Sequence, residues 1–216
     1  MIFLPQYDLE IRTCPKVLST SLKAMAYLLE NGEEFKPFVV AGKERSVHWC
    51  YQTKPFDRQR SSRASIRVAF VRDPVRRFTS FYKNRVLHKR SSDVHQFERL
   101  ANKQMIVTPT PDYLIRNLDE YRKLVPTIDH HAARQVEFLG RDLSYYDYVF
   151  AANSVPAFEA FMSELAGHQV RLPHQQVSGP KQGSMSWLTR RTVRRYYGED
   201  FEVYGEALSS GVWARK

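Results

Sequence analysis

The sequence predicts an α/β fold of three layers, in which helices flank a central, mostly parallel sheet. Short apolar runs rich in β-branched and aromatic residues alternate with segments whose apolar residues recur at helical spacing. This alternation is typical of parallel strands joined by crossover helices. The 216 residues, 43% of them hydrophobic, suit one core of ordinary size and contain no internal repeat. We therefore expect a single domain over residues 1–216.

The first elements of this alternation lie in the N-terminal third of the chain. The segment YDLEIRTC is typical of a strand, and the apolar residues after it have the spacing of a helix face: Leu22, Met25, Ala26 and Leu29. FKPFVVAG indicates a short second strand. The basic segment DRQRSSRAS predicts an exposed loop, and the run IRVAFV after it predicts a buried parallel strand.

The alternation continues to the C-terminal third. In RDPVRRFTSFYKNRV, Asp73 suits the N-cap and Pro74 the first helical position, so a helix is expected to start there. Residues 90–140 are charged and are expected to be helical, with a loop at VTPTPDY. YYDYVFA predicts another strand. SVPAFEAFMSELAG predicts a helix that opens on a capping residue and carries Phe158, Phe161, Met162 and Leu165 at helical spacing.

The composition limits the classes of function. There are 33 lysines and arginines against 23 aspartates and glutamates, and the resulting charge of +10 predicts an anionic partner. Cys14 and Cys50 have neither the number nor the spacing of a disulfide framework or zinc site, which favours small hydrophobes in a reduced, cytoplasmic chain. The N-terminal segment lacks the features of a secretory signal, and no apolar run approaches the ~18 residues of a membrane span. We expect a soluble protein.

The segment CPKVLSTSLK lies at the predicted turn from the first strand into the first helix, and it has the donors of an anion site. Ligands of open α/β sheets bind where helix N-termini point, and the first N–H groups of a helix lack partners within it. Two lysines and three hydroxyls add to these donors: Lys16, Lys23, Ser19, Thr20 and Ser21. The structural alternative is a capped helix with solvated lysines. A Walker A loop is excluded, because no glycine precedes Gly32.

A second polar group follows the buried strand IRVAFV. Arg72 comes at the carboxyl end of that strand, and Ser80 lies two turns into the next predicted helix. A guanidinium is a planar fork suited to phosphate oxygens, and a serine hydroxyl supplies a further donor. Helical spacing places Arg76, Ser80 and Lys83 on one face. A solvated basic face accounts for Arg76 and Lys83, but it does not account for the Arg-Asp-Pro at the strand end.

With these two segments in this order, the sequence resembles the sulfotransferases that use 3′-phosphoadenosine 5′-phosphosulfate (PAPS), particularly the carbohydrate type. In that family a loop P-K-x-x-x-[ST] binds the 5′-phosphosulfate, and a later R-D-P-x-x-R-x-x-S-x-[YF] binds the 3′-phosphate. This chain has PKVLSTSLK and RDPVRRFTSFY. YYDYVFAANSV and YYGEDFEVYG look like the family's strand near the adenosine and its closing segment. Leu18 stands where many members have glycine.

The resemblance implies a P-loop-like fold and in-line transfer of a sulfuryl group from PAPS to a glycan hydroxyl. Adenosine 3′,5′-bisphosphate (PAP) would be the other product, and no metal would be needed, because positioning and charge stabilisation do most of the work. Lys16 would contact the bridging oxygen as the leaving phosphate gains charge. Arg72 and Ser80 would bind the 3′-phosphate. The other residues expected to bind the cofactor are Ser19, Thr20, Ser21 and Lys23.

The base for the acceptor hydroxyl is expected among the seven histidines, because an imidazole titrates near neutral pH. His48 lies between the two cofactor motifs, about where uronyl 2-O-sulfotransferases carry a catalytic histidine. His130 and His131, followed by Arg134, match a later family segment that approaches the acceptor. The remaining candidates are His88, His95, His168 and His174.

Two other functions stay open at this point. A basic chain with twelve tyrosines and thirteen phenylalanines has the residues of a nucleic-acid-binding module, although it carries no helix-turn-helix, RRM or zinc-finger signature. A nucleotide kinase could use the first loop for ATP, but the Walker glycines and an obvious magnesium-carboxylate arrangement are missing. The identity of the acceptor does not follow from the sequence.

Overall fold

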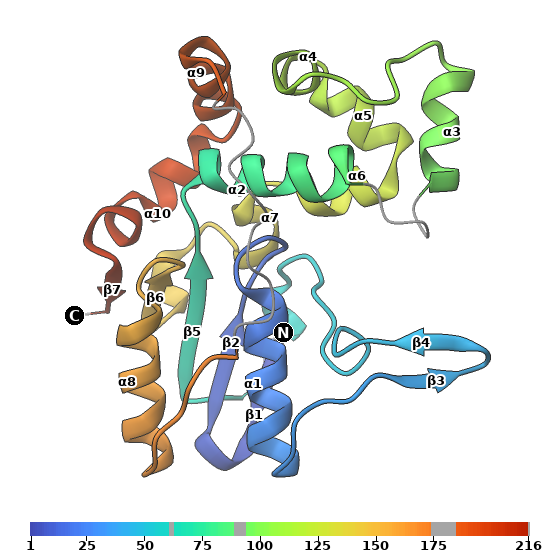
Figure 1. The fold of residues 1–216 in the computed structure, drawn as a ribbon. Coiled ribbons are helices and arrows are strands. Elements are labelled where there is room, and N and C mark those ends of the chain that lie inside the picture. The colour runs from blue at the N-terminus through green and yellow to red at the C-terminus, as the bar shows by residue number, and fades with distance from the viewer. Residues whose placement is uncertain (61–62, 89–93, 174–184, 216) are drawn as a thin grey trace. The chain divides into compact units, whose positions relative to one another are not determined.

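The fold is described from a computed structural model of the chain (Figure 1). The structure describes residues 1–60, 63–88, 94–173 and 185–215. Within these residues the chain forms two compact units. The first unit takes the described residues of Met1–Arg72, Gln135–Val177 and Val203–Lys216, and the second takes those of Asp73–Arg134 and Ser178–Glu202.

A five-stranded sheet forms the centre of the first unit. Its strands, in spatial order, are β1 (Ile2–Leu4), β2 (Leu9–Arg12), β5 (Ile66–Val71), β6 (Tyr148–Ala151) and β7 (Val212–Ala214). β2, β5 and β6 run parallel, and β1 and β7 pair antiparallel at the two edges. Helices flank this sheet (Figure 1), so the α/β fold predicted from the alternation is confirmed.

The three parallel strands are those that the apolar runs predicted. The last four residues of β5 and the last three of β6 are buried, as expected of strands covered on both faces. Helix α8 (Val155–Ala166) packs Phe158 against them, with its ring centroid 4.7 Å from that of Phe70 and 5.4 Å from that of Phe150. Ser154 occupies the N-cap position of α8, but its side chain makes no cap hydrogen bond, contrary to the capping role expected from the sequence.

Helix α1 (Ser19–Asn31) follows β2 in the chain and buries most of the stripe that the spacing predicted, with Leu29 half-buried. Leu22, Met25 and Ala26 are buried on this helix. It ends at Gly32, whose φ of 73° is left-handed and whose N–H donates to the carbonyl of Leu28, a common way for a glycine to close a helix. Other short helices of this unit are η1 (Pro5–Tyr7), η2 (Arg58–Arg60), α7 (Gln135–Leu139) and η5 (Leu143–Tyr145).

The segment FKPFVVAG does form a strand, but that strand lies outside the central sheet. It is β3 (Phe38–Val40), which pairs antiparallel with β4 (Lys43–Arg45) as a separate hairpin. Ala41 and Gly42 form the turn with φ values of 50° and 70°, as tight two-residue hairpins require. All three residues of β3 are exposed, so this strand has no core face.

The second unit is helical, as expected of the described part of residues 90–140, but the last three residues of the predicted loop VTPTPDY already begin a helix. Its elements are α2 (Pro74–Phe81), the π-helical η3 (Tyr82–Leu87), α3 (Val94–Asn102), α4 (Pro111–Arg116), α5 (Leu118–Leu124), α6 (Pro126–Ala132) and α9 (Trp187–Tyr196). Helix α10 (Gly198–Ser210) begins in this unit and ends in the first. None of the described helices has the length and apolar character needed to cross a membrane.

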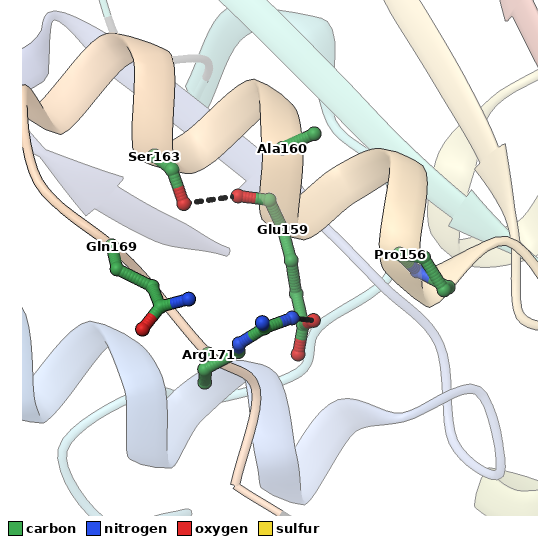
Figure 2. Close-up of a pocket in the computed structure, with 6 residues that line it drawn as sticks. All are labelled: Pro156, Glu159, Ala160, Ser163, Gln169 and Arg171. Carbon is green, nitrogen blue, oxygen red and sulfur yellow. Dashed lines mark hydrogen bonds and ion pairs between the residues drawn. The ribbon is translucent and has the colours of Figure 1, made fainter.

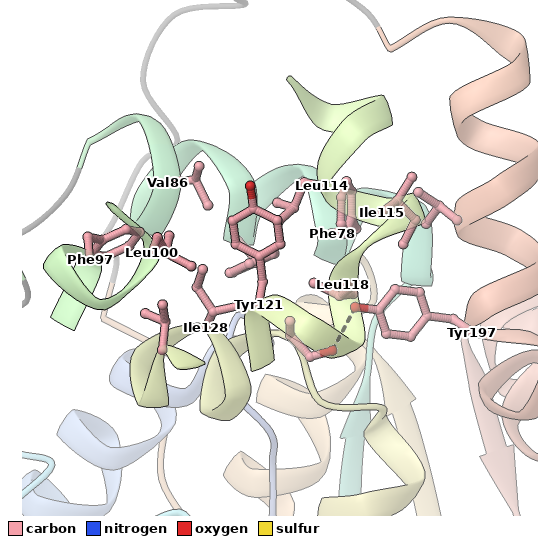
Figure 3. Close-up of a cluster of buried hydrophobic side chains, with 14 of the residues drawn as sticks. Phe78, Val86, Phe97, Leu100, Leu114, Ile115, Leu118, Tyr121, Ile128 and Tyr197 are labelled. Atoms are coloured by element: carbon pink, nitrogen blue, oxygen red, sulfur yellow. Dashed lines mark hydrogen bonds between the residues drawn. The ribbon is translucent and has the colours of Figure 1, made fainter. Parts of the chain in front are cut away.

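An apolar cluster holds the helices of the second unit together. Figure 3 shows Phe78 of α2 among side chains of α4 and α5, including Leu114 and Leu118. Two buried tyrosines satisfy their hydroxyls on backbone carbonyls: Tyr197 donates to Ala132 at 2.6 Å, and Tyr121 donates to Ile106 at 2.7 Å. A buried hydroxyl without such a partner would lose its hydration without compensation.

The start of α2 is the cap that the sequence predicted. The Asp73 carboxylate accepts the N–H of Arg76 at 2.9 Å, and Pro74 occupies the first helical position. After Phe81 the backbone changes to the π-helical η3, a form that often marks functional sites. Lys83 lies in this segment, so the regular helical spacing that placed it on one face with Arg76 and Ser80 does not extend to it.

Candidate active site

The loop between β2 and α1 is held by hydrogen bonds to its own backbone. The Thr13 hydroxyl donates to the carbonyl of Val17 at 2.5 Å, and the N–H of Val17 donates to the carbonyl of Cys14 at 3.3 Å. Lys16 and Leu18 both have left-handed backbones, with φ values of 70° and 52°. These contacts bend the chain sharply between the strand and the helix.

Leu18 adopts the conformation for which glycine is the usual residue. It is the N-cap of α1, and its carbonyl accepts the N–H of Leu22 at 3.0 Å, which starts the helical hydrogen bonding. A left-handed residue next to a right-handed one directs consecutive N–H groups to one side, as in anion-binding nests. Leu18 thus adopts the left-handed conformation that a glycine would adopt more easily, at a conformational cost of about 1 kcal/mol.

Two hydrogen bonds join the side-chain amide of Gln135 to the backbone at the end of β5. Its amide oxygen accepts the N–H of Arg72 at 2.9 Å, and its amide nitrogen donates to the carbonyl of Arg72 at 2.9 Å. The Cys14 thiol lies 3.8 Å from the same amide oxygen. Arg72 in turn donates from Nη1 to the carbonyl of Lys16 at 3.1 Å. Arg72 and the first loop, predicted as parts of one site, are thus in contact.

His48 lies against the first two turns of α1. Its Nε2 is 3.2 Å from the Thr20 hydroxyl, and its Nδ1 is 2.9 Å from the Lys23 amine. The amine also donates to the Thr53 hydroxyl at 2.7 Å. Lys23 is only 1% exposed, and burial lowers its pKa to about 8. The structure thus brings the imidazole to Thr20 and Lys23, which were predicted to bind the cofactor.

The other predicted residues belong to the second unit. Ser80 is half-buried on α2, while Arg76 is exposed. His130 and His131 close α6 with ring centroids 5.1 Å apart, and the carbonyl of His131 accepts from the buried Arg77 at 3.3 Å. Arg134 donates to the carbonyl of Tyr196 at 3.1 Å and stacks on its ring at 4.9 Å.

The other described histidines and the two cysteines differ in exposure. His88 and His95 are exposed, Nδ1 of His168 lies 3.1 Å from the carbonyl of Ala166, and His174 lies outside the described residues. Cys14 is buried, as expected of a small hydrophobe. Cys50 is exposed to solvent, so its interpretation as a packed hydrophobe is wrong.

Sequence reasoning missed Gln135 and Thr53. Gln135 is fully buried among apolar neighbours of α7, and Thr53 precedes a lysine and a proline in an irregular segment. Neither residue belongs to a periodic pattern or a motif. Their roles come from hydrogen bonds to residues 63 and 30 positions away in the chain.

A pocket beside α8 contains none of the predicted residues (Figure 2). Its polar groups bind one another: the Glu159 carboxylate accepts from Arg171 at 2.8 Å and from the N–H of Leu172 at 2.8 Å, and the Ser163 hydroxyl donates to the Glu159 carbonyl. These groups already have hydrogen-bond partners in one another. The pocket is therefore interpreted as a packing contact between α8 and the segment that follows it.

Comparison with known proteins identifies a family for the chain. The model of the Sulfotransferase family matches residues 1–205. The match includes the loop between β2 and α1, Arg72, and the motif that continues into α2. No curated protein and no solved structure matches the chain.

The left-handed backbone at Leu18 predicts an unusual order of stability between two truncations. We expect the free energy of unfolding of Leu18→Gly to be about 1 kcal/mol higher than that of Leu18→Ala, because only glycine tolerates this φ without strain. Leu22, a buried helical residue, is the control: there the alanine variant should be the more stable by about 1 kcal/mol. Urea denaturation measures all four variants, and the same order at both positions would contradict the loop geometry.

Proposed function

Because the chain belongs to the sulfotransferase family, we propose that it transfers a sulfuryl group from PAPS to a hydroxyl of a glycan, leaving PAP. The observation that carries the proposal is the match over residues 1–205, which includes both phosphate motifs and residues of both compact units. We accordingly propose that the two units together make one sulfotransferase domain over residues 1–216. The reaction is an in-line displacement in which positioned donors stabilise developing charge.

The first loop is proposed to hold the phosphosulfate. The N–H groups at the start of α1 and the hydroxyls of Ser19, Thr20 and Ser21 are donors at a helix N-terminus, where the dipole favours an anion. Lys16 is proposed to contact the bridging oxygen and to stabilise it as the sulfur–oxygen bond breaks. The left-handed backbones at Lys16 and Leu18 support this assignment, because they shape the turn from which these donors project.

Arg72 and Ser80 are proposed to bind the 3′-phosphate. A guanidinium carries five N–H donors, so the bond from Arg72 to the Lys16 carbonyl does not exhaust its capacity for a phosphate. That same bond would connect the two phosphate sites, because a shift of Arg72 would move the backbone of the first loop. Ser80 supplies a neutral donor from α2.

His48 is proposed to take the proton of the acceptor hydroxyl. Its contact with the Thr20 hydroxyl supports this role, because Thr20 is proposed to hold the phosphosulfate. The acceptor oxygen would attack sulfur, its proton would pass to the imidazole, and the bond to the leaving phosphate would break. His130, His131 and Arg134 are proposed to lie on the acceptor side.

The charge of +10 supports an anionic or large glycan as the acceptor, since a basic surface attracts acidic sugars. Part of that charge is used within the protein: the Arg12 guanidinium, for example, forms an ion pair with the buried Glu10 at 2.5 Å. We also propose a reducing, cytoplasmic setting, which Cys14 and Cys50 support because neither forms a disulfide within the described residues.

The 3′-phosphate assignment predicts selective loss of affinity. We expect Ser80→Ala to weaken PAP binding about 10-fold or more and to leave adenosine 5′-phosphate binding unchanged, because only PAP carries the 3′-phosphate. Arg72→Lys should show the same selectivity, since it keeps the charge but loses the fork. Titration calorimetry compares the two ligands, with Thr79→Ala on the same helix as the control. Equal losses for both ligands would rule out the assignment.

Lys16 is expected to act on the transition state more than on the bound cofactor. Lys16→Met should lower kcat about 100-fold or more with little change in PAP affinity, because the contact strengthens as charge develops on the leaving oxygen. Single-turnover transfer from labelled PAPS measures the chemical step, and the exposed Lys43 supplies the control variant Lys43→Met. Lost affinity with turnover intact would make Lys16 an ordinary phosphate ligand.

The proposed base predicts a variant that folds and binds but transfers slowly. His48→Ala should bind PAP normally and lose about 10²–10⁴-fold in rate, the usual contribution of general-base catalysis. His168→Ala, an exposed histidine with a backbone contact, is the control and should keep the full rate. If His48→Ala retains the rate, the role passes to His131 or His130, and the same assay on those variants decides between them.

A further inference from the structure

Lys23 carries a buried amine that contacts a histidine and a threonine. Its Nζ lies 2.9 Å from Nδ1 of His48 and donates to the Thr53 hydroxyl at 2.7 Å. The residue is 1% exposed, although it sits on the first turns of a helix whose outer residues are half-buried or exposed. A lysine that serves as a solvated charge or a general phosphate attractor would not need this burial.

The protonation state of Lys23 limits which ring nitrogen of His48 can accept a proton. An ammonium group has no lone pair, so beside it Nδ1 must accept and the proton of the neutral imidazole must sit on Nε2. In that tautomer Nε2 donates to the Thr20 hydroxyl and cannot take a proton. A neutral amine is different, because its lone pair can accept Nδ1–H while one of its own N–H groups still donates to Thr53. Nε2 then carries a lone pair that can accept a proton, so the imidazole can act as a base.

We propose that Lys23 is a positioning residue whose protonation selects the tautomer of His48, so that the imidazole becomes a base only when Lys23 is a neutral amine. The proposal rests on the proposed role of His48 in sulfuryl transfer. In the step itself, the acceptor oxygen bonds to sulfur, its proton goes to Nε2, and the sulfur–oxygen bond to the leaving phosphate breaks. The imidazolium then passes its Nδ1 proton to the Lys23 amine. This restores the ammonium form, which must lose one proton to solvent before the next turnover.

The surroundings of the pair favour a titration in the accessible range. Burial lowers the pKa of Lys23 to about 8. The Met1 amino group interacts with the charge of Lys23, and also with those of Arg12, Glu10 and Lys54. Burial first, and then the charges of Lys23 and Arg12, lower the pKa of the Met1 amino group to about 6. Positive charge is therefore disfavoured at the Met1 amino group, and burial disfavours it at Lys23.

Ring ¹⁵N spectra of His48 in the whole, cofactor-free protein test the pair without catalysis. We expect the proton on Nε2 at about pH 7 and on Nδ1 at about pH 9, with the change centred at about the pKa of Lys23. The same protonated nitrogen at both pH values would overturn the proposal.

Two substitutions of Lys23 extend the test to turnover: one keeps the positive charge and the other removes the amine. For the wild-type protein, kcat/KM for a glycan acceptor should rise about tenfold between about pH 7 and pH 9. Lys23→Arg cannot lose its charge and should lack this rise. Lys23→Met removes the amine, and its midpoint should fall toward the ~6.5 of an unperturbed imidazole. Lys43→Met, at an exposed position of the β3–β4 hairpin, is the control and should keep the wild-type profile. One common midpoint in all four proteins would contradict the inference.

Failure of this inference is distinguishable from failure of the proposed function. If His48→Ala keeps full transfer while the ¹⁵N switch persists, His48 is not the base and the inference falls with it, although the proton-sharing contact stands. If the switch is absent while His48→Ala is slow, the base assignment stands and the inference fails. Calorimetry with PAP covers the remaining possibility: Lys23→Met should bind PAP within a few-fold of wild type, and a large loss with an unchanged pH midpoint would make Lys23 a phosphate ligand instead.

Discussion

The side-chain amide of Gln135 is the contact on which the geometry of the first loop depends. It satisfies both backbone groups of Arg72, where β5 ends and the sheet can no longer do so. With its backbone fixed, Arg72 can reach the carbonyl of Lys16. Two segments 56 residues apart in the chain are thereby held together by hydrogen bonds among buried or half-buried groups, for which an unmade bond would cost about 1–3 kcal/mol.

The first loop combines local strain with buried charge, and both are features of functional sites. Two non-glycine residues, Lys16 and Leu18, hold left-handed backbones within three positions. A few positions later, Lys23 keeps an amine out of water beside an imidazole. Neither arrangement is the most stable choice for an isolated loop, so each requires the packing around it. Rigid donors and a buried amine of this kind would suit the proposed site, which is to hold an anion and to move one proton before and during transfer.

Much of the fold could be predicted because its signals are local. β2, β5, β6, α1 and α8 follow from apolar periodicity, and the cap of α2 follows from Asp73 and Pro74. The edge strands β1 and β7 could not be predicted, since three residues carry no period and their pairing depends on distant partners. The same reason applies to the hairpin of β3 and β4, to the π-helical turn after α2, and to the division of the chain into two compact units.

The sequence by itself determined the α/β class, the order of the PKVLSTSLK and RDPVRRFTSFY segments and the family, because each depends on residue types at short, regular spacing. Only the tertiary structure decided which side chains meet. Gln135 and Thr53 became part of the candidate site through long-range hydrogen bonds, and Lys23 changed from an apparent surface donor into a buried neighbour of His48. Spacing along a helix says which residues share a face, but burial and partner choice depend on what packs against that face. The chemistry of a titratable group depends on those surroundings, so the state of His48 and Lys23 lies beyond any local pattern.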